Sequence, residues 1–208
     1  MQSANTQPTR RTPLVAAGIL LGAGLGGFVD GILLHQILQW HNMLSGQLPP
    51  DTLVRAKVNM YWDGLFHAAV WVLTAVGLAT LWSATGRPDV PHSGRTLVGG
   101  LALGWGLFNV IEGIIDHEIL GLHHVYEYTP NHLPADLGFL ALGLLLLLAG
   151  WALVQVLVPV VAMAIWRPEL TLGVVWVLGL NTAFAGLWAG AGGLFRRAAG
   201  PQGGRLVA

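Results

Sequence analysis

Long apolar runs separated by short polar segments dominate the hydrophobic pattern of the chain. Four runs cover residues 14–40, 61–82, 96–122 and 136–157, and a fifth covers residues 171–194. A transmembrane helix needs about 20 mostly apolar residues, so each run is long enough to cross a bilayer. The pattern predicts an all-α integral membrane protein with a four-helix bundle and a fifth, C-terminal membrane helix.

Composition supports this class and removes others. The chain is 54% hydrophobic and only 10% charged, whereas soluble domains carry about 25% charged residues. The lipid bilayer is therefore its first expected partner. Lys+Arg and Asp+Glu both number 10, and without a basic surface we expect no nucleic-acid partner. Membrane-protein partners and a homo-oligomer remain open. The absence of cysteine excludes disulfides and thiolate metal sites.

Basic residues at the ends of the runs predict the orientation, since cytoplasmic loops are enriched in Lys and Arg. Five arginines place the N-terminus in the cytoplasm: Arg10, Arg11, Arg87, Arg95 and Arg167. Arg55 and Lys57, predicted in the first outer loop, oppose this orientation.

The chain contains an internal repeat at an offset of 82 residues. Residues 18–41 match residues 100–123 at 11 of 24 positions, and each copy has an acid followed by His five and eleven residues later. A weaker similarity between the second and fourth runs, at an offset of 73 residues, aligns Asp63 with Asp136. A two-helix repeat returns the chain to the same side, so the two halves are predicted to be parallel repeats about an axis along the membrane normal.

These observations divide the chain into three parts. Residues 1–13 form a cytoplasmic tail, and residues 14–158 form the bundle with its repeats at 14–82 and 96–158. Residues 159–208 form a C-terminal extension with the fifth segment.

Histidines and acids gather at the predicted outer end of this bundle. A charged group near the bilayer centre costs at least about 2.5–3.5 kcal/mol, so the deep acids Asp30 and Glu112 need a proton, a partner or a cation. Nine residues form the predicted metal site: Asp30, His35, His41, Asp63, His67, Glu112, Asp116, His117 and His123. Nitrogen and oxygen ligands suit iron, zinc, copper or manganese.

Helical spacing places these groups unequally. Asn109, Glu112, Asp116 and His123 fall on one stripe of an α-helix. His35 and the equivalent His117 follow their acids by five residues, which at 100° per residue points them roughly 140° away. We therefore expect them to reach an adjacent helix or to support the ligands from outside.

Three segments carry a resemblance to a known family: residues 27–41, 59–67 and 104–113. Over about residues 14–155 the chain resembles the bacterial membrane family of domain of unknown function 2243. The resemblance implies a small multi-pass protein of the bacterial inner membrane with a histidine- and acid-rich outer end, and it implies no activity. The family often has a second histidine where this chain has Asn42 and Glu118, so neither is assigned as a ligand.

Three functions follow from this site. The first is a membrane metalloprotein, as an enzyme or otherwise, with redox, hydrolytic or oxygen-dependent chemistry. The second is a proton or metal-ion carrier or chaperone that uses a buried acid–His relay, although the inner half of the bundle offers almost only apolar residues. The third is haem binding between His35 and His117.

Overall fold

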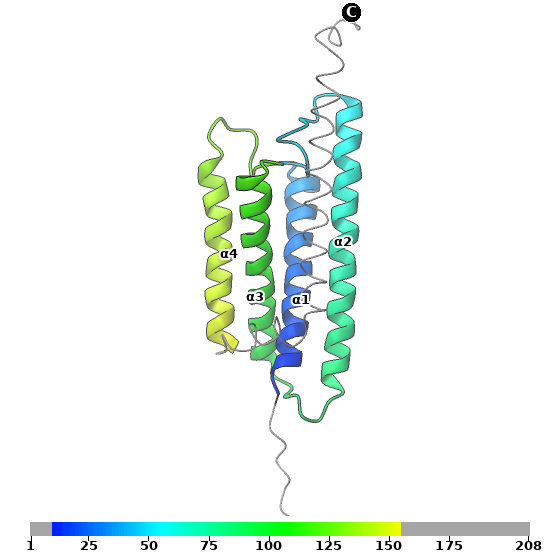
Figure 1. Cartoon of the computed structure of the whole chain (residues 1–208), viewed down its shortest axis with the longest axis vertical. Coiled ribbons are helices and arrows are strands. Elements are labelled where there is room, and N and C mark those ends of the chain that lie inside the picture. Colours follow the sequence, from blue (N-terminus) through cyan, green and yellow to red (C-terminus); the bar gives the residue numbers. More distant parts are fainter. Residues whose placement is uncertain (1–9, 155–208) are drawn as a thin grey trace, which may run out of the picture.

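The computed structural model describes residues 10–154, and every regular element within this range is a helix (Figure 1). Two of its helices continue as π-helices. The elements are α1 (Thr12–Phe28) with η1 (Val29–Ile37), α2 (Leu53–Thr85), α3 (Gly94–Glu112) with η2 (Gly113–Ile119), and α4 (Leu133–Val154). All four are long and apolar enough to cross a membrane, as predicted. The predicted fifth segment lies outside the described residues.

The second helix begins earlier than the apolar pattern predicted. It starts at Leu53 rather than near residue 61, because the Thr52 side chain caps it by accepting a hydrogen bond from the Arg55 amide. Arg55 and Lys57 therefore lie in its first turns, and their placement in a loop was wrong. Hydrophobicity marks the part of a helix suited to lipid, whereas the cap marks where the helix starts.

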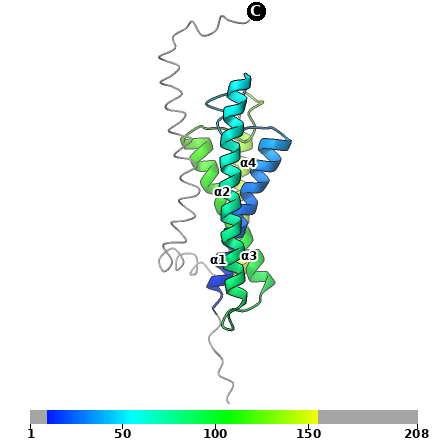
Figure 2. The same ribbon diagram turned by 90° about the vertical axis from the view of Figure 1, so that its right-hand side faces the viewer.

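Helices α1 and α3 form the middle of the bundle. They pack against each other and cross, as Figure 2 shows, while α2 packs on α1 and α4 on α3. Glycines allow this close approach. A Cβ added to Gly18 would lie 2.8 Å from the Gly100 Cα, and one added to Gly100 would lie 3.0 Å from the Gly18 Cα. Small residues serve this purpose where membrane helices meet backbone to backbone.

Equivalent positions in the two halves adopt the same local structure. Both π-helices follow directly on their α-helices, and each is followed by a residue in the left-handed region, Gln39 with φ 52° and Gly121 with φ 54°. These two residues are 82 positions apart. The backbone bonds that close the π-helices are also equivalent, from the Leu38 amide to the Leu33 carbonyl and from the Leu120 amide to the Ile115 carbonyl.

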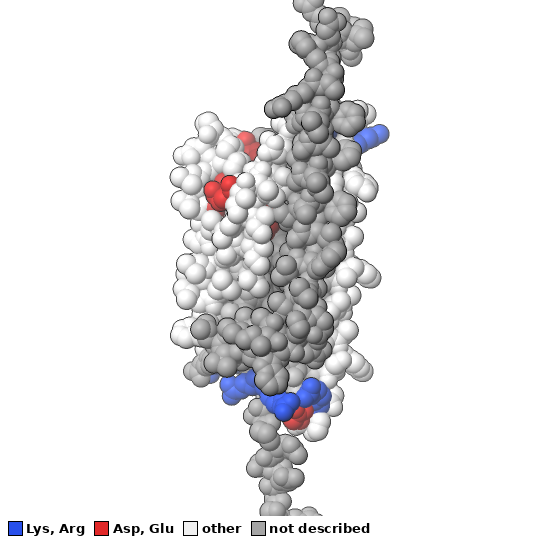
Figure 3. All heavy atoms as spheres, viewed as in Figure 1, with Lys and Arg blue, Asp and Glu red and all other residues white. Residues whose placement is uncertain are grey.

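The two ends of the bundle differ in character. Arg10, Arg11, Arg87 and Arg95 lie at the end where α1 begins, and Lys and Arg side chains gather there (Figure 3). We call this the basic end. Loops 38–52 and 120–132 lie at the opposite end, which we call the site end. The assignment of the basic end to the cytoplasm stays a prediction.

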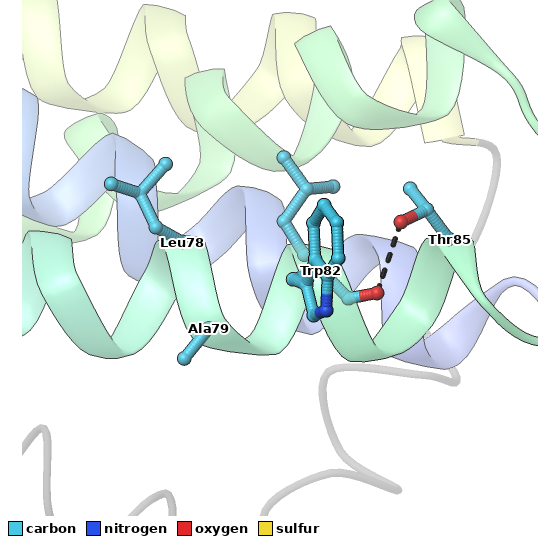
Figure 4. Close-up of a pocket in the computed structure, with 5 residues that line it drawn as sticks. Leu78, Ala79, Trp82 and Thr85 are labelled. Atoms are coloured by element: carbon cyan, nitrogen blue, oxygen red, sulfur yellow. Dashed lines mark hydrogen bonds between the residues drawn. The ribbon is translucent and has the colours of Figure 1, made fainter.

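A surface hollow of about 480 Å³ lies on α2 toward the basic end (Figure 4). It is lined by Leu78, Ala79, Leu81, Trp82 and Thr85. The Thr85 hydroxyl donates to the Trp82 carbonyl, and no lining residue is titratable. The hollow is thus lined mainly by apolar side chains.

Candidate metal centre

Four histidines and two acids from both halves meet at the site end. Two sets of ligand atoms lie within 4.8 Å of one another, one from His35, His41 and His123 and the other from Glu112, His117 and His123. The Asp30 carboxylate lies beside the first set, 3.0 Å from His35 Nε2. We call these six residues the centre. All six are buried, the four histidines to 2% exposure or less.

The π-helices place His35 and His117 beside the acids that precede them by five residues, Asp30 and Glu112. His35 Nε2 lies 3.0 Å from Asp30 Oδ2, and His117 Nε2 lies 3.1 Å from Glu112 Oε1. The expectation that these imidazoles point away from their acids was therefore wrong. It assumed α-helical geometry, whereas a π-helix has roughly 4.4 residues per turn and places residues five apart nearly above one another.

The rings of His41 and His123 are oriented by the opposite loop. His41 Nδ1 donates to the Val125 carbonyl at 2.9 Å, and His123 Nδ1 donates to the Met43 carbonyl at 3.2 Å. The two rings are stacked, with centroids 4.6 Å apart and planes within 6°. Because a carbonyl only accepts, each Nδ1 carries a proton, and in a neutral ring Nε2 then holds a lone pair.

The electrostatics of His41 favour this neutral form. Burial lowers the pKa of His41 well below its usual value of 6.5, and the neighbouring His123 and His35 lower it further. A neutral imidazole with a free Nε2 is the form that binds metal ions.

Asp63 and Asp136 occupy equivalent places just outside the centre. Asp63 Oδ1 accepts from the Met43 amide at 2.8 Å and lies 3.0 Å from His35 Nδ1. Asp136 Oδ1 accepts from the Val125 amide at 2.9 Å and lies 3.5 Å from His117 Nδ1. Each acid thus attaches an outer loop to the bundle and faces the outward nitrogen of one histidine.

Some nitrogen and oxygen atoms inside the centre lie at hydrogen-bonding distance although neither atom of the pair carries a hydrogen. His123 Nε2 lies 2.9 Å from Glu112 Oε1, although its Nδ1 already holds the proton of a neutral ring. His41 Nε2, Asp30 Oδ1 and Glu112 Oε2 are buried and have no hydrogen-bond partner within residues 10–154. Lone pairs this close repel one another, so either additional protons or a cation must lie between them.

The two loops close the centre from the aqueous side. The Gly46 amide donates to the Leu122 carbonyl, and the Glu127 amide donates to the Trp40 carbonyl. Met43, Leu44 and Leu122 are the fully buried apolar side chains of these loops. We call loops 38–52 and 120–132 together the cap.

Three residues singled out from the sequence belong to neither set of close ligand atoms. His67 is half-buried, and its Nδ1 donates to the Asp63 carbonyl of its own helix at 2.6 Å. Asp116 is buried. Asn109 is also buried, and its Oδ1 has no hydrogen-bond partner among the described residues.

Asp136 and His124 were not assigned to the site from the sequence. His124 Nδ1 lies 2.7 Å from Asp136 Oδ2, and the equivalent Asn42 donates to Asp63 Oδ2 at 2.8 Å. The alignment of Asp63 with Asp136 contained the signal: an acid in one half implied a matching acid in the other.

Comparison with known proteins identifies the family. No curated protein and no solved structure matches the chain significantly. A family model described as "Predicted membrane protein (DUF2243)" matches residues 17–156, which include all four described helices apart from the first residues of α1. The chain therefore belongs to this family of predicted membrane proteins, and its buried His, Asp and Glu groups form a site that could hold a metal ion.

Proposed function

We propose that the protein is a membrane metalloprotein that binds one transition metal ion at the centre. Its ligands come from the Nε2 atoms of four histidines and the carboxylates of two acids: His35, His41, His117, His123, Asp30 and Glu112. The observation that carries the proposal is the common orientation of the rings. Every Nδ1 faces an acceptor outside the centre, while every Nε2 faces inward.

This arrangement is typical of metal-bound histidine. A ligating imidazole usually donates its second ring nitrogen to a carboxylate or backbone carbonyl, which sets the tautomer and the ring orientation. Asp63 and Asp136 supply the carboxylates, and Val125 and Met43 supply the carbonyls. The role of Asp63 is therefore to orient His35, in place of the direct ligation expected from the sequence.

Three contacts within the centre have the spacing of adjacent metal ligands. Metal–ligand bonds of about 2.1 Å separate adjacent ligands of an octahedron by about 3.0 Å. The contacts of His123 and His117 with Glu112 Oε1 measure 2.9 and 3.1 Å, and that of His35 with Asp30 measures 3.0 Å.

A single ion is favoured over two. The two sets of close ligand atoms share His123, and the single lone pair of its Nε2 can bind only one ion. Iron and manganese accept six nitrogen and oxygen ligands readily, while zinc prefers four. The positive-inside rule favours a centre toward the extracytoplasmic side of a bacterial inner membrane.

The carrier and haem alternatives receive less support. On the basic side of the centre, α1 and α3 meet at glycines whose Cβ atoms would overlap the opposite backbone, so these two helices leave no space for an ion between them. A haem between His35 and His117 would have to displace the rings of His41 and His123, whose centroids lie 4.5 Å from that of His35 and 4.8 Å from that of His117.

Elemental analysis tests the proposal. The full chain is purified in detergent without added metal, and metal-free protein is then titrated with Fe(II), Mn(II) and Zn(II) under anaerobic conditions. We expect one equivalent of a transition metal per chain, lost in His123→Ala and Glu112→Ala because each removes a ligand.

His92→Ala is the matched control, since His92 is a histidine near the basic end, away from the centre. Trace metal that is equal in wild type, His123→Ala and His92→Ala, with no tight binding in the titrations, would disprove metal binding.

A further inference from the structure

We propose that the centre exchanges single electrons with a one-electron carrier in the aqueous phase at the site end, through Trp40, Tyr126 and Tyr128, and binds no substrate at the metal. This inference rests on the proposed function. Three observations carry it: the protein groups that surround the place of the ion, the cap over the centre, and the row of aromatic rings that leads from the cap to solvent.

Protein groups from both halves surround the place of the ion. The two sets of close ligand atoms share His123, and the Asp30 carboxylate lies beside the first set. Catalytic metal sites keep a position open for water or substrate. A substrate could use such a position here only by passing the cap, whereas electron transfer needs no direct contact between metal and substrate.

The cap supports the same conclusion. His41 and His123 are 2% and 1% exposed, and Met43, Leu44 and Leu122 of the cap are no more exposed than His41. Reciprocal hydrogen bonds join the two loops of the cap. The Met43 and Val125 amides also attach the loops to the bundle by donating to Asp63 and Asp136. A substrate molecule would have to break these bonds to reach the metal, while an electron would not.

Aromatic rings connect the centre to the aqueous surface. Trp40 precedes the ligand His41, and its ring meets the Tyr126 ring edge to face with centroids 5.4 Å apart. Tyr126 in turn meets Tyr128 at 5.7 Å, and Tyr128 is 69% exposed. The Val125 carbonyl that binds His41 belongs to the residue beside Tyr126. Delocalised π-systems at these separations provide a short path for an electron from a ligand to solvent.

The electron step is balanced by a one-electron carrier outside the protein. The reduced ion loses one electron to an oxidised carrier, so the ion is oxidised by one unit and the carrier is reduced by one unit. No bond forms or breaks and no proton is required. The step needs a metal with two accessible oxidation states, which selects iron, manganese or copper over zinc.

Small exogenous ligands test whether the metal is closed. The full chain is loaded with iron, and azide and nitric oxide are added while the absorption and electron paramagnetic resonance spectra are recorded. We expect both spectra to stay unchanged because the cap keeps these ligands away from the metal. A spectral shift that saturates with azide or nitric oxide would show an open position and overturn the inference.

Stopped-flow oxidation tests the aromatic path. Iron(II)-loaded protein is mixed with hexacyanoferrate(III), and the loss of its absorbance is followed. We expect one electron per centre in wild type, and a several-fold loss of rate in Trp40→Leu and Tyr126→Leu at unchanged iron content. Tyr128→Leu, at a position that is 69% exposed, should also slow the reaction.

Trp71→Leu is the matched control, because Trp71 is a 65% exposed aromatic residue on α2 away from the cap. Equal rates in wild type and all three cap variants would overturn the path. The failures are distinguishable: an iron-free protein disproves the metal centre itself, while an iron-loaded protein that binds azide or ignores the cap variants disproves only this inference.

Discussion

Replacement of Asp63 by asparagine should destabilise the protein and weaken the centre together. Asp63 is buried and accepts at both oxygens. Oδ1 contacts the Met43 amide at 2.8 Å and His35 Nδ1 at 3.0 Å, while Oδ2 accepts from Asn42 at 2.8 Å and from Gln36 at 3.2 Å. An amide keeps one accepting oxygen and replaces the other with a donor, so one of these pairs must lose its acceptor.

The magnitude follows from which pair is lost. Asn42 is partly buried and Gln36 is exposed, and both side chains can rotate. The new side-chain amide in Asp63→Asn will therefore turn its nitrogen toward them. Two hydrogen bonds to a charged group are then lost, each worth about 1.5–3 kcal/mol, with some recovery through water. We expect the free energy of unfolding to fall by about 2–4 kcal/mol. Metal affinity should fall by about 10–100-fold because His35 loses a charged partner.

Unfolding in mixed micelles with increasing dodecyl sulfate, followed by tryptophan fluorescence, measures the stability of the metal-free chain. Metal titration measures the second effect separately. Asp51→Asn is the matched control, since Asp51 forms an exposed pair with Arg55 at 2.9 Å and such pairs contribute about 0–1 kcal/mol. If Asp63→Asn were as stable as Asp51→Asn, the assignment of Asp63 as the attachment point of the cap would be refuted.

Three further outcomes are expected. Asp136→Asn should lower stability and metal affinity as Asp63→Asn does, but its effect on metal affinity should be smaller because Asp136 Oδ1 lies 3.5 Å from His117 Nδ1. A larger loss of metal affinity than in Asp63→Asn would contradict this ranking. Gly104→Ala should lower the thermal unfolding midpoint, since a Cβ there overlaps the Ile19 backbone and overpacking costs about 1–3 kcal/mol, whereas Gly64→Ala, which has nothing within 4 Å, should not. Burial raises the pKa of Glu127 above its usual 4.5, opposed by a Ser45 hydrogen bond and by His123. The folded state therefore binds this proton more tightly than the unfolded state does. The contribution of Glu127 to the free energy of unfolding falls as pH rises through the raised pKa. Glu127→Gln should accordingly gain stability relative to wild type as pH rises from about 4 to 7 in the same unfolding assay. A pH-independent difference would contradict this.

The repeat explains why part of the centre was predictable. An acid followed by histidines five and eleven residues later recurs after 82 positions, and apolar sequence does not readily reproduce such a combination by chance. Asp30, His41, Glu112 and His123 were accordingly predicted as neighbours, and their ligand atoms lie close together. The distinction between inner ligands and outer partners was not predictable, because it depends on which oxygen faces which ring nitrogen.

The helix bounds show the same division. The apolar runs indicated the four spans, but α2 extends beyond its run because Thr52 supplies the cap. Equally, nothing in the hydrophobic pattern marks the change from α- to π-helix at Val29 and Gly113. That change depends on backbone hydrogen bonding near the end of each helix, where the following loop packs across the bundle.

The sequence by itself determined the class of the protein, its four spans, its two matched halves and the gathering of histidines and acids at one end. Those properties follow from composition and spacing, which local patterns record directly. Only the tertiary structure decided how the groups meet. The π-helices turn His35 and His117 back onto their acids, and each loop orients a histidine of the other half through a carbonyl about 80 residues away in the sequence. Such contacts depend on the crossing of α1 and α3, and spacing along one helix contains no record of them.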